Sequence, residues 1–518
     1  MNEMTFAFWM GVQMKRVLPF FLALAFSAPA WGQTVDDRGA KQLSNDLSRY
    51  IGKKVLDSGI LKISADGDAY RIAFDFNALI RANSSKDPLT FNLVPFAMLV
   101  KPRSDGSWSV SSDLAPNAFV DVEGPHGVRF SVSGSAFSGI YDPRLAAFTS
   151  GAGSMAGMQV TSRDPKEPMD LSVGAGTSTL NASKSVGGGV DFAMTQTIAD
   201  FVETAIADEG ETGLKVPVTM KSPRMSTEIT GSGVRTKAFL DLLGFAIVNQ
   251  DEASLKTNQA ELKSLLTSAL PLWERLEYSY RFDGISVGSP AGNFELADLS
   301  ATTGLDGISD NGKIDCRIEA TGLTVPQHLL PSWSAALLPT DIELSFGGAN
   351  LDLDSMLRKA IEAFDLNKNP PLSDEFGETL IADFMANNPK VVLAHSTVRN
   401  GSIEVAMEGE MTFPGKKPEA RMIVDVAGYD KIVQTLQTAA KSDQQAAQAF
   451  PFALAVKGFG KTLPNGRMEW VINAKADGSV TVNGAMLKPA DAVLDGPLTD
   501  PSDATAGDDD NGGAKLQP

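Results

Sequence analysis

The stretch ILKISADGDAYRIAFDF (residues 60–76) holds two runs in which apolar and polar residues alternate, separated by Asp66-Gly67-Asp68. Alternation with a period of two is typical of a half-buried β-strand, and an Asp-Gly turn between two such runs indicates a hairpin. Strands joined by so tight a turn must pair antiparallel. This stretch therefore predicts a β-hairpin with one buried face.

The same pattern recurs along the chain. Residues 89–110 repeat it around Ser104-Asp105-Gly106, and residues 118–133 repeat it around Gly124-Pro125-His126-Gly127. The Gly- and Ser-rich stretch 149–190 still alternates and is interpreted as irregular strands rather than a linker. Further strands are expected within 275–346 and at 390–398, 402–413, 418–427, 451–459, 466–475 and 478–484.

Helical spacing appears between these runs. Residues 39–57 place Leu43, Leu47, Ile51 and Val55 four apart, on one helical face. Other helices are expected at 195–208, 237–270, 352–364, 374–387 and 428–442. The predicted fold class is α+β, predominantly antiparallel sheet of hairpins and meanders with several interspersed amphipathic helices. A helix followed by hairpins occurs at 39–133 and again at 374–427, which suggests a duplicated unit.

The amino-terminal residues resemble a secretory signal. Lys15 and Arg16 precede the apolar run Val17–Phe26, which is too short to span a hydrocarbon core of roughly 30 Å. Small residues then predict cleavage between Gly32 and Gln33 and a periplasmic location. An uncleaved anchor helix over residues 6–26 is the alternative, although charged residues and a proline interrupt it.

Four segments are predicted: a signal peptide at 1–32, an N-terminal sheet-rich α+β domain at 33–212, a C-terminal one at 213–490, and a disordered acidic tail at 491–518. No later segment is long and apolar enough for a membrane span.

Composition excludes several classes of function. The 518 residues are 43% apolar and 21% charged, which is typical of a globular protein, and the formal net charge is −18. An acidic surface disfavours nucleic acid and bare anionic lipid headgroups as partners. One cysteine, Cys316, excludes a disulfide scaffold, and three histidines argue against a histidine-built metal site.

Catalytic motifs are absent or misplaced. Gly284-Ile285-Ser286-Val287-Gly288 matches the G-x-S-x-G pattern, but it follows a predicted strand and leads into a loop, where a hydrolase needs a strand-to-helix turn. Only His328 and His395 lie downstream as bases. Residues 306–315 (DGISDNGKID) place a glycine where a calcium loop needs its first acid. We therefore predict no catalytic residue, no cofactor and no metal site.

Three runs are apolar on both faces: Phe91 to Val100, Phe239 to Val248 and Phe450 to Val456. They are interpreted either as core or as the lining for a lipid-like ligand, because an antiparallel sheet can leave one face uncovered. The 27 phenylalanines against six tryptophans and six tyrosines favour an apolar ligand over a sugar.

The closing third resembles a known group of proteins. Asn388-Pro389-Lys390-Val391, the segment Arg399 to Val405 and the segment Glu408 to Met411 follow the strand and turn pattern of YdgA-like and AsmA-like envelope proteins of Gram-negative bacteria. Leu463 to Trp470 and Asp477 to Gly484 continue it, in the style of an uncharacterised periplasmic family of alphaproteobacteria. The resemblance implies antiparallel sheet with helices, an envelope location and, for AsmA-like members, association with lipid movement.

The sequence thus predicts an exported protein without catalytic activity that binds a lipid or apolar ligand in a sheet groove. The alternative is a structural or protein-interaction factor of the envelope that pairs through exposed sheet edges. A serine hydrolase built on Ser286 is the second alternative.

Overall fold

The computed structural model describes residues 35–57, 59, 61–75, 96–112, 117–121, 127–164, 168–209 and 214–491. The predicted signal peptide, the start of the apolar run at Phe91, the turn at His126 and nearly all of the predicted tail lie outside the described residues.

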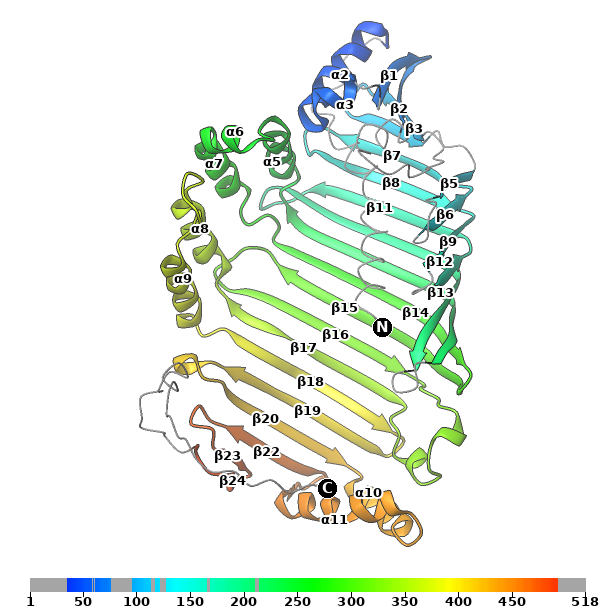
Figure 1. The fold of residues 1–518 in the computed structure, drawn as a ribbon, viewed down its shortest axis with the longest axis vertical. Helices are drawn as coiled ribbons and strands as arrows, with labels where there is room; N and C mark the ends of the chain where they lie inside the picture. The colour runs from blue at the N-terminus through cyan, green and yellow to red at the C-terminus, as the bar shows by residue number, and fades with distance from the viewer. Residues whose placement is uncertain are drawn as a thin grey trace, which may run out of the picture.

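All the described strands belong to one antiparallel sheet, which runs the length of the molecule (Figure 1). In chain order they are β1 (Leu61–Asp66), β2 (Ala69–Phe74), β3 (Phe96–Pro102), β4 (Trp108–Ser112), β5 (Asn117–Asp121), β6 (Val128–Ser133), β7 (Ala136–Asp142), β8 (Ala147–Met155), β9 (Gly157–Ser162), β10 (Met169–Val173), β11 (Gly176–Lys184) and β12 (Val190–Glu209). They continue as β13 (Leu214–Val234), β14 (Arg275–Ser289), β15 (Gly292–Asp306), β16 (Gly312–Thr321), β17 (Asp341–Leu351), β18 (Lys390–Asn400), β19 (Ile403–Thr412), β20 (Glu419–Ala427), β21 (Lys461–Thr462), β22 (Met468–Ala474), β23 (Val480–Val482) and β24 (Ala485–Lys488).

The predicted antiparallel hairpins are confirmed. β1 pairs with β2 around Gly67, β3 pairs with β4, and β5 pairs with β6. From β12 to β20 each strand pairs with the next one in the chain, so this part is a simple meander. The predicted domain boundary at residue 212 lies between β12 and β13, which pair along their lengths, so the sheet continues across it.

The helices lie at the ends and along one margin of the sheet (Figure 1). They are α2 (Asp37–Ile51), α3 (Lys53–Asp57), α5 (Thr236–Val248), α6 (Glu252–Thr257), α7 (Gln259–Ala269), α8 (Leu353–Ala363), α9 (Asp374–Ala386), α10 (Tyr429–Ala439) and α11 (Gln444–Phe459), with short 3₁₀ turns η1 (Gln327–Leu329), η2 (Ser334–Ala336) and η3 (Pro414–Lys416). Side chains of Asp36, Asp251, Asp352, Ser373 and Asp443 accept hydrogen bonds from first-turn backbone N–H groups, which fixes where five of these helices begin.

Four predicted elements differ from the structure. The helix predicted at 39–57 is divided into α2 and α3 at Gly52, which has a positive φ of 84°. The helix predicted at 195–208 is part of strand β12, the helix predicted at 237–270 is divided into α5, α6 and α7, and the strand predicted at 451–459 is the second half of α11. The helix predicted at 237–270 is divided because Asp251 and Asn258 are capping positions, at which new helices begin. In α11, alanine-rich sequence after the Asp443 cap favours a helix over the alternation of large and small residues.

A crease crosses the sheet, and we define it by Gly134, Ala156, Gly174, Asp200, Pro223, Gly284, Ala297 and Gly322. At these positions strands end or ladder pairing is interrupted. Four of them have left-handed backbones: Gly134 (φ 58°), Asp200 (φ 51°), Gly284 (φ 65°) and Gly322 (φ 66°). Glycine adopts this conformation without steric cost, and a proline within a strand removes a ladder hydrogen bond.

The crease reverses which residues of a strand face which side. Ile198 and Phe201 are three apart on β12 and yet belong to one buried cluster, together with Met158 and Val173. Strict alternation would put residues three apart on opposite faces, so the left-handed Asp200 between them shifts the phase. This shift gives β12 the apolar spacing of a helix, which explains the wrong helix prediction at 195–208.

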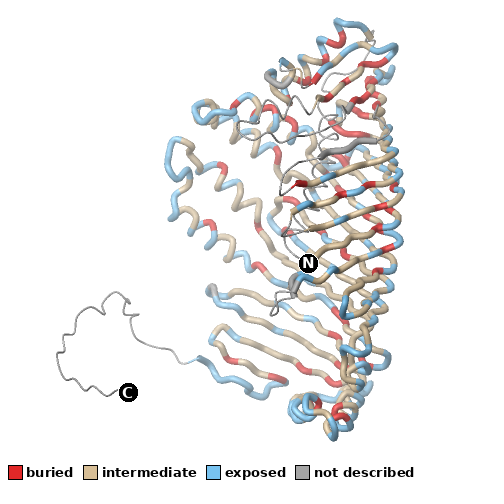
Figure 2. The backbone as a smooth tube through the Cα atoms, turned by 45° about the vertical axis from the view of Figure 1, so that its right-hand side comes forward, coloured by how far each residue is buried: buried red, intermediate tan, exposed pale blue. Residues whose placement is uncertain are grey.

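Fully buried core is concentrated in three places. At the amino-terminal end, Leu43 and Leu47 of α2 and Leu240 of α5 pack against Tyr70 and Trp108 of the sheet. At the carboxyl-terminal end, Val426, Met468 and Trp470 pack against α10 and α11. The third cluster lines the crease, and buried positions are sparse in between (Figure 2).

Candidate functional site

The register of the central strands separates an apolar face from a polar face. Residues directly opposite in an antiparallel pair point to the same side, and alternate residues of a strand point to opposite sides. The apolar face, followed from β14 to β18, consists of Leu276, Tyr278, Tyr280, Phe282, Leu299, Ala301, Thr303, Leu305, Ile314, Cys316, Ile318, Ala320, Ile342, Leu344, Phe346, Val391, Leu393 and Val398. A bulge between Leu393 and Ser396 brings Val398 back to this side.

The large side chains of the apolar face are not packed into a core by the described residues. Phe346 is 43% exposed, Val391 is 46% exposed and Ile314 is 39% exposed. The other large apolar side chains of the face are half-buried, and among its members Ala301 alone is fully buried. A sheet normally buries its apolar side against a second layer. In the central strands, the described residues supply no such layer.

The size of this face exceeds what isolated surface residues explain. Strands lie about 4.8 Å apart, so the five strands from β14 to β18 span roughly 20 Å. With about 20 Å of strand length on the helix side of the crease, the face covers a plan area of about 400 Å². Contiguous exposed apolar surface on this scale marks interaction sites in soluble proteins.

An aromatic column on β14 leads from this face into the crease. The rings of Tyr278 and Tyr280 are 6.1 Å apart, those of Tyr280 and Phe282 are 6.0 Å apart, and Phe282 meets Phe201 edge to face at 5.6 Å. Burial raises the pKa of Tyr278 to about 12 and also raises the pKa of Tyr280. Both phenols therefore stay neutral at physiological pH.

One carboxylate lies in an apolar row beyond the crease. Glu203 of β12 is directly opposite Leu171 on one side and Met220 on the other, and both of these pack against the crease cluster. Burial raises the pKa of Glu203. A carboxyl group so placed can accept a hydrogen bond from a hydroxyl or ammonium group held against the apolar face. No motif of the sequence singled out Glu203, which lies within the segment 195–208 that was predicted to be a helix.

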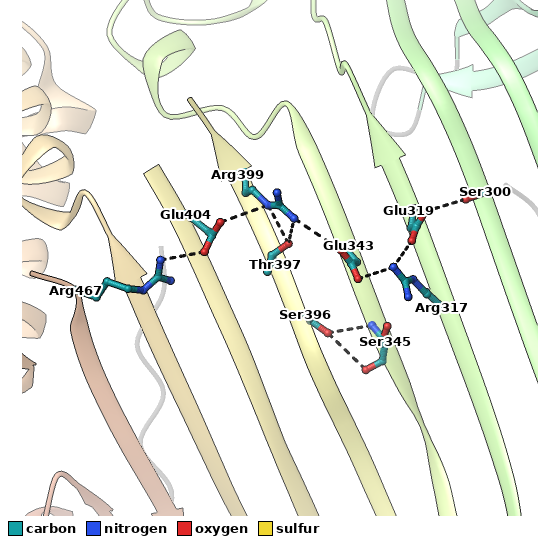
Figure 3. Close-up of polar contacts among 10 residues, drawn as sticks. All are labelled: Ser300, Arg317, Glu319, Glu343, Ser345, Ser396, Thr397, Arg399, Glu404 and Arg467. Atoms are coloured by element: carbon teal, nitrogen blue, oxygen red, sulfur yellow. Dashed lines mark hydrogen bonds and ion pairs between the residues drawn. The ribbon is translucent and has the colours of Figure 1, made fainter. Parts of the chain in front are cut away.

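The polar face carries a ladder of alternating charges (Figure 3). Arg467 binds Glu404 at 3.0 Å, and Glu404 lies 3.5 Å from Arg399. Arg399 and Arg317 both contact Glu343, at 3.7 and 2.8 Å, so the ladder crosses four strands. Exposed pairs of this kind contribute little stability each, but they keep this face in water and leave the opposite face as the apolar one.

Charged groups elsewhere on the polar face are also paired. A cavity of about 430 Å³ at the crease is lined by Arg224, Arg281, Asp283 and Asp298. Arg224 contacts Asp283 at 2.5 Å and Arg281 contacts Asp298 at 2.6 Å, so the positive and negative groups balance.

The sequence-predicted catalytic motif does not form a hydrolase site. Ser286 lies within β14, opposite Lys221 and Glu295, and the chain continues into another strand. His328 lies in η1, and His395 lies on β18 with Glu408 at 3.9 Å. The structure therefore shows Ser286 in a regular strand with no nucleophile elbow.

The acidic turn at 306–315 also has another role. Asp306 and Asp315 both contact the guanidinium of Arg275, at 2.8 and 3.0 Å. Hydrogen bonds from Arg275 and Lys313 lower the pKa of Asp315, although partial burial opposes them. Within the described ranges no cluster of three potential metal-ligating side chains occurs.

The described parts of the three runs that are apolar on both faces lie in three different elements of the structure. The run from Phe239 to Val248 forms α5, and the run from Phe450 to Val456 lies in α11. The described part of the run ending at Val100 forms β3, with Val100 fully buried. None of the described residues of these runs belongs to the central apolar face, whose residues come from ordinary alternating strands.

No helix in the described part of the chain is both long enough and apolar enough to cross a membrane. Comparisons with protein-family models, curated proteins and solved structures found no match to this chain.

Proposed function

We propose that this protein is an exported, periplasmic binding module without catalytic activity, which holds a lipid or another long apolar ligand against the apolar face of its sheet. The observation that carries the proposal is the half-exposed state of large side chains such as Tyr280, Leu344 and Phe346, in the middle of a sheet whose two ends are covered by helices. The sequence resemblance to envelope proteins agrees with this location but stays a prediction.

Physical chemistry favours a flexible apolar ligand. Removing apolar surface from water is favourable by about 25 cal/mol per Å², so a ligand that covers even 200 Å² of the face gains about 5 kcal/mol before ordering costs. Charged or sugar-like ligands gain nothing comparable from Leu, Ile and Phe side chains. The neutral phenol of Tyr280 gives the face a polar atom that can orient a ligand without adding charge, whereas the phenol oxygen of Tyr278 is buried.

Two neighbouring threonines of β15 give a matched test. Thr303 is opposite Tyr278 and Cys316 on the apolar face, and Thr302 is opposite Ser279 and Arg317 on the polar face. We expect Thr303→Asp to weaken binding of a fluorescent fatty acid at least tenfold, because the ligand would cover an unpaired charge. Thr302→Asp should leave the affinity within about twofold.

The single cysteine offers an independent readout on the same face. Cys316 can be labelled with a polarity-sensitive dye in the full chain, because no other thiol is present. Addition of fatty acid should shift the emission of this dye. In the control, the dye sits on the polar face in a Cys316→Ser, Thr302→Cys chain, and its emission should not change. Equal loss of binding in both aspartate variants, or no binding by the unmodified chain, would refute the proposal.

A further inference from the structure

We infer that α11 is a docking element for an anionic lipid bilayer, at the carboxyl-terminal end of the apolar face. The inference rests on the proposed function, since a lipid-binding module needs a bilayer as the source or destination of its ligand. Phe452 is 72% exposed, Leu454 is 45% exposed and Phe459 is 40% exposed, although all three belong to a well-formed helix.

The polarity of α11 is inverted relative to an ordinary surface helix. Its fully buried residues are the small Ala446 and Ala453, and its large side chains Phe452 and Leu454 point outward. A surface helix usually buries its large apolar residues and exposes polar ones. From Pro451 to Phe459 the exposed residues are apolar or glycine, and the one polar side chain, Lys457, is 40% exposed and pairs with Asp430.

Specific hydrogen bonds fix this orientation. The phenol of Tyr429 donates to the carbonyl of Ala453 at 2.8 Å, and the indole of Trp470 donates to the carbonyl of Val456 at 2.9 Å. The amide of Asn483 donates to the carbonyl of Phe459 at 2.8 Å. Because α10, β22 and the β23–β24 turn all hold the helix, it cannot simply roll to bury its phenylalanines.

The chain as a whole is acidic and disfavours anionic headgroups, but the local charge around α11 is positive and favours an anionic bilayer as the occupant. Residues 429–461 contain four lysines and two aspartates, in a chain with a net charge of −18. Lys441 and Lys461 are both exposed, and no carboxylate in the described part of the chain forms an ion pair with either of them. Each basic residue near an anionic membrane surface contributes about 1 kcal/mol of attraction. A second copy placed symmetrically on this patch would instead bring lysines against lysines.

The position of the helix connects the docking surface to the proposed ligand site. α10 and α11 pack on Val426, Met468 and Trp470, which continue the apolar face at its carboxyl-terminal end. A bilayer contacted by Phe452 would therefore lie at the end of the face.

The experiment measures sedimentation of the full chain with vesicles of phosphatidylcholine, with and without phosphatidylglycerol. We expect partitioning into the vesicles that contain phosphatidylglycerol, reduced about tenfold or more by Phe452→Glu with Leu454→Glu. Ile381→Glu is the matched control, because Ile381 of α9 is 59% exposed on a helix away from α11. Lys441→Glu with Lys461→Glu should reduce binding to the anionic vesicles and leave phosphatidylcholine binding unchanged.

Three results would overturn the inference: no partitioning of the unmodified chain, equal partitioning of the Phe452→Glu, Leu454→Glu chain, or a dimer in solution that these substitutions dissociate. The same variants separate this inference from the proposed function. Their affinity for a soluble fluorescent fatty acid should match that of the unmodified chain, because α11 lies outside the central apolar face.

Discussion

Replacing one phenylalanine at the crease and one on the apolar face tests whether the central sheet has an uncovered side. Phe201 is 5% exposed and packs edge to face on Phe282, with an interplanar angle of 77°. Truncating a phenylalanine in such a packed site costs about 3–5 kcal/mol, because transfer and cavity terms add. Phe346 is 43% exposed, and no second layer of described residues encloses it. Phe346→Ala should therefore cost only part of the free energy of transferring the side chain out of water, about 1 kcal/mol, with no added cost for a cavity.

The assay is urea unfolding of the full chain, followed by tryptophan fluorescence. Trp108 and Trp470 are buried at opposite ends of the sheet and report on both end clusters. We expect Phe201→Ala to lower the free energy of unfolding by about 4 kcal/mol. In a double-mutant cycle with Phe282→Ala, the coupling free energy should be about 1 kcal/mol.

Comparing the stability loss of Phe346→Ala with that of Phe201→Ala decides whether the apolar face is uncovered. If Phe346→Ala costs as much as Phe201→Ala, the apolar face is packed beneath a second layer in the native protein, and it is not a ligand site. If Phe201→Ala costs less than about 1 kcal/mol, the crease is not a core, and the account of why the sheet turns there is wrong.

Two further changes test the backbone of the crease and the carboxylate beside it. Gly322→Ala should destabilise the protein more than Gly401→Ala. Both glycines have a left-handed backbone, which costs an alanine about 1 kcal/mol. A Cβ on Gly322 would lie 2.7 Å from the Cβ of Ala297, whereas a Cβ on Gly401 would meet nothing within 4 Å. Equal losses of unfolding free energy in urea would show that the crease tolerates a side chain. Glu203→Gln should raise stability at pH 7 and change it little at pH 4. The pKa of Glu203 is higher in the folded protein, so stability falls as the pH rises through the interval between its unfolded and folded values; an unchanged difference between the two pH values would contradict the burial of this carboxyl.

The strands and turns of this fold could be predicted from the sequence because each hairpin carries its own local signal. The Asp66-Gly67-Asp68 turn and the alternation on either side of it are present within 17 residues, and β1 and β2 pair as expected. The same holds for the β3–β4 and β5–β6 pairs. Local patterns suffice here, since in a meander each strand pairs with its neighbour in the chain.

The crease and the candidate site could not be predicted in the same way. Asp200 changes the phase of β12, so Ile198 and Phe201 acquire the spacing of a helix, and sequence patterns alone do not separate that case from a true helix. Alternation shows that Tyr280 and Phe282 share a face. It does not show that no second layer covers that face, which depends on where distant helices such as α2 and α11 pack. Likewise, the outward direction of Phe452 depends on Tyr429 and Trp470, which lie 23 and 18 residues away in sequence.

A single-layer sheet with one apolar face has few ways to keep that face from water, and this chain uses two of them over part of its length. Helices cover both ends, and the crease brings side chains such as Ile198, Phe201 and Phe282 together along an inner corner. The crease brings apolar side chains together only where they lie next to it, because a residue two positions along a strand is already about 7 Å from the crease. The remaining strip, from Tyr278 to Phe346, is therefore left half-exposed by the geometry itself. On the opposite face, Arg317, Glu343 and Arg399 form charge pairs that would be costly to bury. The sheet therefore cannot fold so that the strip packs against this polar face. Within the described residues nothing else covers this strip. A bound apolar ligand would remove it from water, and this is the physical basis for the proposed function.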